Sequence, residues 1–177
     1  YINDDTAWLR KAVRWVVNIV VAIACGWFLV YGFGEQVLIS GNSMQPQLSA
    51  QDVVLMNRII YVTGTPDRFD VVVFEREDGK KNVKRIIGLP GETVQIRDNR
   101  VYINGEPLKE DKMGEVSLAG RAADPVRLGE KEYFLLGDNR GSSEDSRFPN
   151  IGNVKREQIL GKAWFRMLPL LNLGFVS

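Results

Sequence analysis

The chain contains no histidine among its 177 residues. This absence excludes a Ser-His-Asp triad, a Cys-His nucleophile pair and a catalytic metal held by imidazole. A nucleophilic serine in this chain must therefore pass its proton to a lysine, an aspartate or a glutamate. If the chain is a hydrolase, its general base is one of these three residue types.

Cysteine is almost absent, because Cys25 is the only one and lies inside an apolar run. A disulfide within the chain and a Cys-ligated zinc site are both excluded. There is no D-x-D-x-D-G loop of the kind that binds Ca²⁺. The 23 basic and 22 acidic residues give a net charge of +1, without a dense Lys/Arg run. We therefore expect no metal, no cofactor and no nucleic-acid partner.

One long uncharged run is present, "WVVNIVVAIACGWFLVYGF" at residues 15–33, with Asn18 as its one strongly polar residue. As a helix it would span roughly 28 Å, close to the thickness of a bilayer's hydrocarbon core. A cleavable signal peptide would have a shorter apolar core followed by an A-x-A-like site. The sequence "YGFGEQVLIS" follows instead, so we predict a retained transmembrane helix.

The charges that flank this run predict its orientation. Residues 1–14 contain three basic residues, whereas the first basic residue after the run is Arg58. The positive-inside rule then places 1–14 in the cytoplasm and 34–177 outside it. The expected protein is single-pass in the cell membrane. The basic residues are Arg10, Lys11 and Arg14.

Beyond the apolar run the hydrophobic period is mostly two, which predicts strands. Asp98-Asn99 and Asn104-Gly105 are typical of hairpin turns, because these residues tolerate positive φ. We expect a mainly β fold with an antiparallel sheet, interrupted by a charged loop or insertion at 106–130. The C-terminal 164–177 either packs on the β core or lies against the bilayer. The predicted strands are 51–59, 69–76, 82–88, 92–97, 100–105 and 131–138.

Ser43 lies in "ISGNSMQPQLSAQD", a turn-rich stretch shortly after the apolar run. From the local residues alone it is either an ordinary turn serine or a nucleophile held near the bilayer. Gly41 and Asn42 could allow an irregular backbone that directs N–H groups toward an oxyanion. Ser43 is thus a candidate nucleophile with nearby candidate oxyanion donors.

A neutral lysine amine is a better base toward a serine hydroxyl than a carboxylate. Burial on an apolar strand would lower the pKa of a lysine from its usual value of about 10.4. Lys84, in "NVKRIIG", meets this condition and points away from the face of Arg85. The other interpretation of Lys84 is a solvated lysine that protects an edge strand.

The segment "GDNRGSSEDSRF", residues 137–148, alternates charged and small polar residues. It is either a solvated loop or a salt-bridged loop packed on the core. In the second case one of its hydroxyls could orient a lysine amine. Four of its five charged residues are Asp138, Arg140, Asp145 and Arg147, and the hydroxyls are Ser142, Ser143 and Ser146.

Three stretches, "SGNSMQP", "VKRIIGLPGE" with "VYINGEPL", and "YFLLGDNRGSSEDSRFPNIG", together resemble in order and spacing the boxes of type I signal peptidases. The resemblance covers nearly the whole chain and is closest to the Gram-positive branch. It implies a Ser/Lys dyad serine protease that removes signal peptides at the outer face of the cytoplasmic membrane. The implied partners are preproteins with small residues at −1 and −3, the lipid bilayer and the secretion translocon.

The resemblance also implies residue roles. Ser43 would be the nucleophile and Lys84 the general base, and Ser143 would orient the lysine. The Ser43 backbone N–H would serve the oxyanion hole, with Gly41, Asn42 and Met44 as substrate-binding or oxyanion residues. Asp138, Asp145, Arg85 and Arg147 would support the site.

Two positions depart from the family pattern. Gln47 stands where the family usually has Thr, and Gly41 lacks the hydroxyl that adds an oxyanion donor in some members. A self-cleaving repressor-type Ser/Lys protease is a weaker alternative, because the predicted transmembrane span argues against it and the Cys-Gly pair that precedes Ser43, Cys25-Gly26, lies inside that span. The alternative from another class is a catalytically inactive membrane-anchored β module or paralogue.

Overall fold

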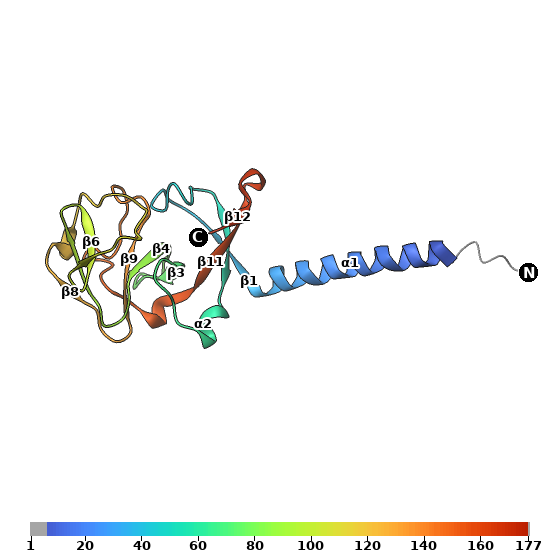
Figure 1. Cartoon of the computed structure of the whole chain (residues 1–177), viewed down its shortest axis with the longest axis horizontal. Helices are drawn as coiled ribbons and strands as arrows, with labels where there is room; N and C mark the ends of the chain where they lie inside the picture. Colours follow the sequence, from blue (N-terminus) through green and yellow to red (C-terminus); the bar gives the residue numbers. More distant parts are fainter. Residues whose placement is uncertain (1–6, 177) are drawn as a thin grey trace, which may run out of the picture. The chain divides into compact units, whose positions relative to one another are not determined.

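The computed structural model describes residues 7–176, without the side chains of residues 7, 28–33 and 63. The chain forms two compact units, residues 1–35 and 36–177. The first is helical and the second is mostly antiparallel β (Figure 1). The predicted fold class, a β domain after an N-terminal helix, is therefore confirmed.

The helix α1 runs from Ala7 to Phe33 and includes the apolar run predicted from the sequence. Its described apolar side chains are exposed, for example Val16 at 60% and Ile23 at 66%. No helix among the described residues is both long enough and apolar enough to cross a membrane. Residues 1–6 of the predicted cytoplasmic segment lie outside the described residues.

The larger sheet has the strand order β1-β2-β11-β3-β4-β9-β10, and β12 adds to β11. The pairings of β11 with β2 and β3, of β3 with β4 and of β4 with β9 are antiparallel. Alternating Val, Ile and Phe residues favour these strands. Their bounds are β1 Gly34–Leu38, β2 Val53–Asn57, β3 Val71–Glu75, β4 Lys81–Gly88, β9 Glu132–Leu136, β10 Val154–Lys155, β11 Ile159–Leu168 and β12 Gly174–Phe175.

The smaller sheet has the order β7-β6-β5-β8. The hairpin of β5 (Thr93–Arg97) and β6 (Arg100–Ile103) turns at Asp98 and Asn99, both with positive φ. Asn104 and Gly105 make the next turn, also with positive φ. Both predicted hairpin turns are thus present for the expected reason.

The segment 106–130, expected as a loop or insertion, contributes to this smaller sheet. It contains β7 (Glu106–Pro107), the 3₁₀ helix η1 (Gly120–Ala123) and β8 (Val126–Arg127). It also supplies buried apolar residues to the core between the sheets: Val116, Ala122, Val126 and Leu128. The segment therefore packs as part of the fold.

Strand β4 lies where the buried apolar clusters meet. Val83 belongs to one cluster, Ile86 to a second and Ile87 to a third. Lys84 and Arg85 lie between them and are only 4% and 2% exposed. Strand β4 thus carries two of the cations predicted for the site, both of them buried.

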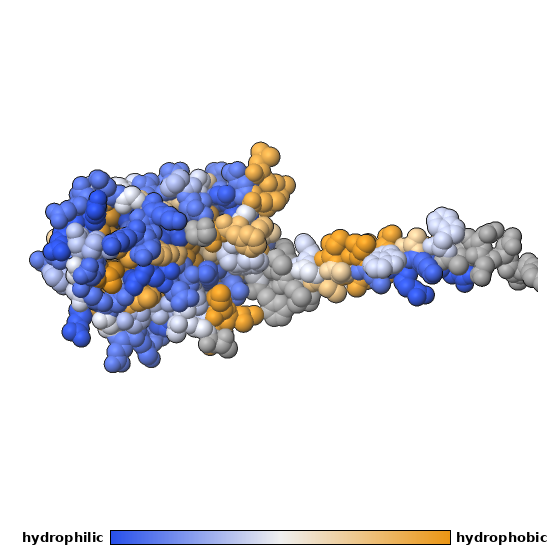
Figure 2. All heavy atoms as spheres, viewed as in Figure 1, coloured by the Kyte–Doolittle hydropathy of each residue, from blue (hydrophilic) through white to orange (hydrophobic). Residues whose placement is uncertain are grey.

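The C-terminal part divides between the core and the surface. Val176 is buried, whereas Leu170, Leu171 and Phe175 are 71%, 97% and 75% exposed. Apolar atoms gather at this turn, formed by η3 (Leu170–Asn172) and β12, and beside the short helix α2 (Ile60–Thr63) (Figure 2). The prediction that 164–177 packs on the β core thus holds for part of the segment, and contact of the exposed part with a bilayer stays a prediction.

Candidate active site

The side chains of Ser43 and Lys84 lie together, with Lys84 Nζ 2.6 Å from Ser43 Oγ. Lys84 stands in the middle of β4, and Ser43 lies in the turn-rich loop between β1 and β2. Met44, the next residue, is 1% exposed and belongs to the same core cluster as Val83. Burial of Met44 therefore holds the Ser43 loop against β4.

Lys84 is shielded from solvent, with 4% of its surface exposed. This burial lowers the pKa of Lys84 to about 8, against the smaller raising effects of Asp145, Glu144 and Asp138. With that pKa about one amine in ten is neutral at pH 7, against a few in ten thousand at the ordinary value. The amine beside Ser43 can therefore accept a proton near neutral pH.

Arg85 points to a different partner from that of its neighbour Lys84. Its Nε and Nη2 donate to the two carboxylate oxygens of Asp138 at 2.8 and 2.7 Å. A third bond runs from Nη1 to the carbonyl of Phe69. Both side chains of the pair are at most 3% exposed. This buried fork fixes the end of β9 against β4 and keeps the second cation away from Ser43.

The segment after β9 is a salt-bridged loop packed on the core, the second of the two interpretations. Arg147 pairs with Asp145 through bonds of 2.8 and 2.9 Å, with side chains 1% and 0% exposed. Arg147 also donates to the carbonyls of Arg140 and Ser143. The Arg85–Asp138 pair thus holds the start of the loop, and the Arg147–Asp145 pair holds its end.

Ser143 lies near the site, but its hydroxyl does not make the hydrogen bond to Lys84 that an orienting residue would make. Its Oγ is buried and has no hydrogen-bond partner within residues 7–176. Ser146 instead accepts a bond from the Leu135 N–H, and Ser142 is exposed. A buried polar atom without a partner in a folded protein calls for an explanation. This one lies beside the loop that carries Ser43.

Of the three predicted oxyanion or substrate residues, two line a groove beside Ser43 and one does not. A groove of about 90 Å³ runs beside Ser43, and Gly41 and Met44 are among its lining residues. Asn42 is not one of them: its carbonyl accepts a bond from Asn139 Nδ2, and its side chain accepts one from Gln45. The full lining is Val37, Leu38, Ile39, Ser40, Gly41, Ser43, Met44, Lys81, Asn82, Val83 and Lys84.

Sequence reasoning missed Asn139 and Gly137, although both stand in the quoted box. The Asn139 N–H donates to the Ser43 carbonyl at 3.0 Å, and its side chain holds the Asn42 carbonyl. A methyl group on Gly137 would lie 2.1 Å from Ser143 Oγ and 2.5 Å from the Ser43 carbonyl oxygen. Only contacts between distant segments reveal these two roles.

The acidic residues whose charges act on Lys84 are Asp145, Glu144 and Asp138. Within the part of the chain that the structure describes, no group of three His, Cys, Asp or Glu residues could hold a metal ion. The nearby carboxylates of Asp138 and Asp145 are taken up by arginines. The chemistry available at this site is that of a hydroxyl beside a buried amine.

Comparison with known proteins gives one consistent match. Residues 12–168 fit the family model described as signal peptidase, peptidase S26. The chain is 32% identical to a probable signal peptidase I-2 of Synechocystis, over 98% of this chain and 79% of that protein. It is 34% identical to signal peptidase I T of Bacillus subtilis, over 89% of this chain and 86% of that protein.

A crystal structure of a signal peptidase I from Enterococcus faecalis is 35% identical in sequence. It matches 56% of this chain and 97% of its own, with a TM-score of 0.48. The family model covers most of the chain, and the two relatives exceed 30% identity over more than three quarters of their length. The chain therefore belongs to the signal peptidase family, peptidase S26.

Proposed function

We propose that Ser43 and Lys84 are the nucleophile and the general base with which this member of the family removes signal peptides from exported preproteins. One observation carries the proposal. A buried lysine, whose pKa burial lowers to about 8, lies 2.6 Å from a serine hydroxyl. A nucleophile and a base within hydrogen-bond reach are the signature of covalent catalysis.

In the acylation step the neutral amine of Lys84 accepts the proton of Ser43 Oγ. The oxygen attacks the carbonyl carbon that ends the signal peptide, and the carbonyl oxygen becomes an oxyanion. The Ser43 backbone N–H is proposed to stabilise that charge. When the intermediate collapses, Lys84 gives its proton to the leaving amine of the mature protein. The signal peptide stays as an ester on Ser43.

In the deacylation step Lys84 is neutral again and accepts a proton from water. The resulting hydroxide attacks the ester, and the C–O bond to Ser43 breaks. The proton returns from Lys84 to Ser43 Oγ, and the signal peptide leaves as a carboxylic acid that loses its remaining proton to water. Ser143 is proposed to accept a hydrogen bond from Lys84 during this cycle, since its buried Oγ is otherwise without a partner among the described residues.

The groove beside Ser43 supports small substrate side chains near the cleaved bond. Its volume is about 90 Å³, and residues of β1 and β4 line it. Such a space accommodates Ala or Gly more readily than a large apolar side chain. We therefore expect preproteins with Ala-x-Ala before the cleavage site to be substrates.

We also propose that the enzyme works at the outer surface of the cell membrane, on preproteins delivered by the secretion translocon. The uncharged run 15–33 would be its anchor, with 1–14 in the cytoplasm and 34–177 outside. The exposed leucines of the η3 turn and the apolar residues beside α2 offer a surface for lipid (Figure 2). Exposed apolar patches of this kind mark membrane or protein contacts.

The dyad is tested by cleavage of an Ala-x-Ala preprotein by the purified full chain in detergent, from pH 6 to 10. We expect Ser43→Ala and Lys84→Ala each to lower kcat by at least about 10³-fold. Lys131→Ala is the matched control, since its side chain is 76% exposed. In the unaltered enzyme kcat should rise with pH through about 8, as Lys84 loses its proton.

Full cleavage by the Lys84→Ala enzyme would identify another base and reject the dyad. A folded wild-type chain that cleaves no preprotein would instead favour the catalytically inactive module. A rate that does not change between pH 7 and 9 would reject a titrating lysine in the rate-limiting step.

A further inference from the structure

We propose that Asp111 is a positioning residue for the active site, acting through Arg140 and Gly137 on Ser143 and Ser43. The inference rests on the proposed Ser43/Lys84 dyad. It assigns a catalytic influence to the segment 106–130, which no sequence motif connects with the reaction.

The first link is a buried ion pair. Arg140 Nη1 and Nη2 donate to the carboxylate oxygens of Asp111 at 2.7 and 2.8 Å, and the two side chains are 3% and 8% exposed. Within residues 7–176, Asp111 supplies the carboxylate that reaches this guanidinium. Two parallel bonds fix the plane of the guanidinium as well as its position.

The second link is made by the Nε–H of Arg140, which lies in the same plane as the two N–H groups that bind Asp111. Arg140 Nε donates to the carbonyl of Gly137 at 3.1 Å. Because the guanidinium is rigid, Asp111 determines where this donor points. Asp111, in the segment 106–130, therefore fixes the carbonyl of Gly137 through Arg140, although Asp111 and Gly137 are 26 positions apart in the chain. The opposite side of Gly137 is held by its N–H, which donates to Asp145 at 3.0 Å.

The third link is steric. Gly137 has no room for a side chain, since an added methyl group would meet Ser143 Oγ at 2.1 Å and the Ser43 carbonyl at 2.5 Å. Its backbone thus lies directly against both residues. A small displacement of Gly137 must move Ser143, the Ser43 loop or both. A misplacement of about 1 Å can lower the rate of a reaction about 10²-fold.

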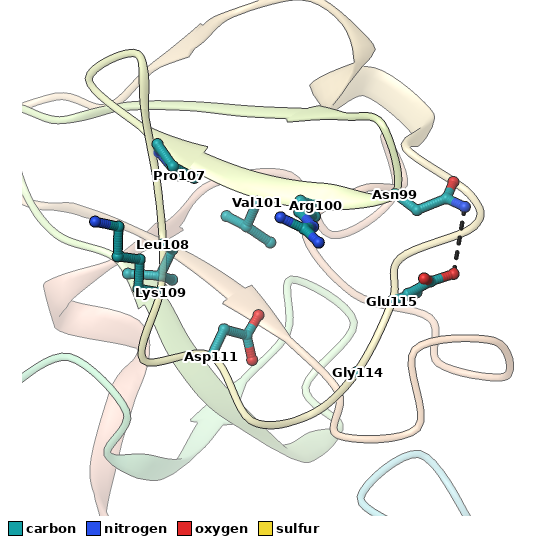
Figure 3. Close-up of a pocket in the computed structure, with 9 residues that line it drawn as sticks. All are labelled: Asn99, Arg100, Val101, Pro107, Leu108, Lys109, Asp111, Gly114 and Glu115. Atoms are coloured by element: carbon teal, nitrogen blue, oxygen red, sulfur yellow. Dashed lines mark hydrogen bonds between the residues drawn. The ribbon is translucent and has the colours of Figure 1, made fainter.

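The position of Asp111 allows a conservative test. A cavity of about 360 Å³ lies beside it, lined by residues of β6 and of the loop after β7. Figure 3 shows Asp111 on that loop, across the cavity from Val101 and Arg100 of β6. The extra methylene of a glutamate can be accommodated in this space, so Asp111→Glu should keep the ion pair.

The test measures kcat and KM of the full chain in detergent with an Ala-x-Ala preprotein. We expect Asp111→Asn to lower kcat about 10- to 100-fold with KM changed less than about twofold. Asp111→Glu should restore most of kcat. The matched control is Glu110→Gln, a neighbouring exposed acid, which should keep the wild-type kcat. Thermal unfolding of each variant establishes the temperature at which all are folded.

Arg140→Lys separates positioning from simple loss of a buried charge. Lysine keeps a cation for Asp111 but cannot also hold the Gly137 carbonyl in the same plane. Positioning predicts a fall in kcat as large as that of Asp111→Asn. If Arg140→Lys keeps the wild-type kcat, the pair has only a structural role and the inference is wrong.

A double-mutant cycle tests the path to Ser143. If Asp111 acts by placing Ser143, Asp111→Asn should lower kcat of the Ser143→Ala enzyme by less than about threefold, because coupled residues are not additive. An equal fall in both backgrounds would overturn the path. Cleavage that persists in Ser43→Ala would overturn the dyad itself. Loss in Ser43→Ala together with full kcat in Asp111→Asn would overturn this inference alone.

Discussion

Lys84 Nζ lies 2.6 Å from Ser43 Oγ although 41 positions separate the two residues in the chain. Two packing features bring them together. Lys84 belongs to a strand that is buried from Val83 to Gly88, and the Ser43 loop is anchored by buried Met44 and by bonds from Asn139. The amine is therefore held in an apolar setting that water-exposed lysines lack, and this setting has measurable consequences.

The first prediction concerns the stability contribution of Lys84. Burial lowers its pKa to about 8 from 10.5, so between these pH values the unfolded chain holds a proton that the folded chain lacks. The free energy of unfolding then rises with pH. Below pH 8 the burial of protonated Lys84 lowers the free energy of unfolding by its full amount, about 3 kcal/mol at 1.36 kcal/mol per pKa unit. Above about pH 10.5 this loss of stability is gone.

We therefore expect Lys84→Met to be more stable than wild type at pH 7 by up to about 3 kcal/mol. The difference should shrink as pH rises from 8 toward 10.5. Denaturant unfolding of both proteins across this range measures it, with Lys131→Met as the exposed control. A difference that is constant from pH 7 to 10 would mean that the pKa of Lys84 is not lowered.

The second prediction concerns the buried pair of Arg85 and Asp138. Asp138→Asn removes the charge that faces a guanidinium only 3% exposed. Breaking such a pair should lower the free energy of unfolding by about 3–5 kcal/mol. The control is Glu157→Gln, whose pair with Lys131 is exposed and 3.7 Å long and should contribute less than about 1 kcal/mol. If both variants lose a similar free energy of unfolding, burial does not decide how much an ion pair contributes to stability.

The third prediction concerns the oxyanion site. No atom lies within 4 Å of a Cβ placed on Gly41, so a side chain fits there. Gly41→Ser should raise kcat, by up to about tenfold, because an added donor near an oxyanion stabilises the transition state. Gly41→Ala controls for backbone restriction and should not change kcat. A Gly41→Ser enzyme no faster than Gly41→Ala would place the oxyanion elsewhere.

The fourth prediction concerns the η3 turn. Leu170 and Leu171 are 71% and 97% exposed. Replacing both with Ser should slow cleavage of a preprotein embedded in liposomes by at least about tenfold, since each leucine buried in lipid contributes about 1.5–3 kcal/mol and about 1.4 kcal/mol is a factor of ten. Cleavage of a short soluble peptide should stay unchanged. Leu118→Ser, at another exposed site, is the control. Equal losses on both substrates would indicate damage to the active site and not lost lipid contact.

Much of the β fold follows from local pattern. The apolar residues of β3 and β4 recur in short runs bounded by turn residues, which predicts strands at 69–76 and 82–88; the observed strands are Val71–Glu75 and Lys81–Gly88. Asn and Asp at the hairpin turns adopt the positive φ that the turns require. The missing histidine restricted the residue types that could serve as a general base, and the apolar strand around Lys84 made it a candidate, although the same pattern allowed a solvated edge-strand lysine. All of these signals act between chain neighbours, so a sequence displays them.

What escaped prediction depends on segments far apart in the chain. The strands β7 and β8 have two residues each, too few to show a period, and exist because β5 and β6 pair with them. The contacts of Asn139 with the Ser43 loop span about 97 positions, and that of Arg140 with Asp111 spans 29. No local pattern marks them.

The sequence by itself thus determined which residue types could perform the chemistry and which strand carries the candidate base. Only the tertiary structure decided how closely Lys84 approaches Ser43, which carboxylates the arginines occupy, and that Ser143 Oγ is buried without a partner among the described residues. The physical reason is that periodicity is set by neighbours along the chain. Burial, pKa and hydrogen-bond geometry are set by whatever the fold packs against each side chain.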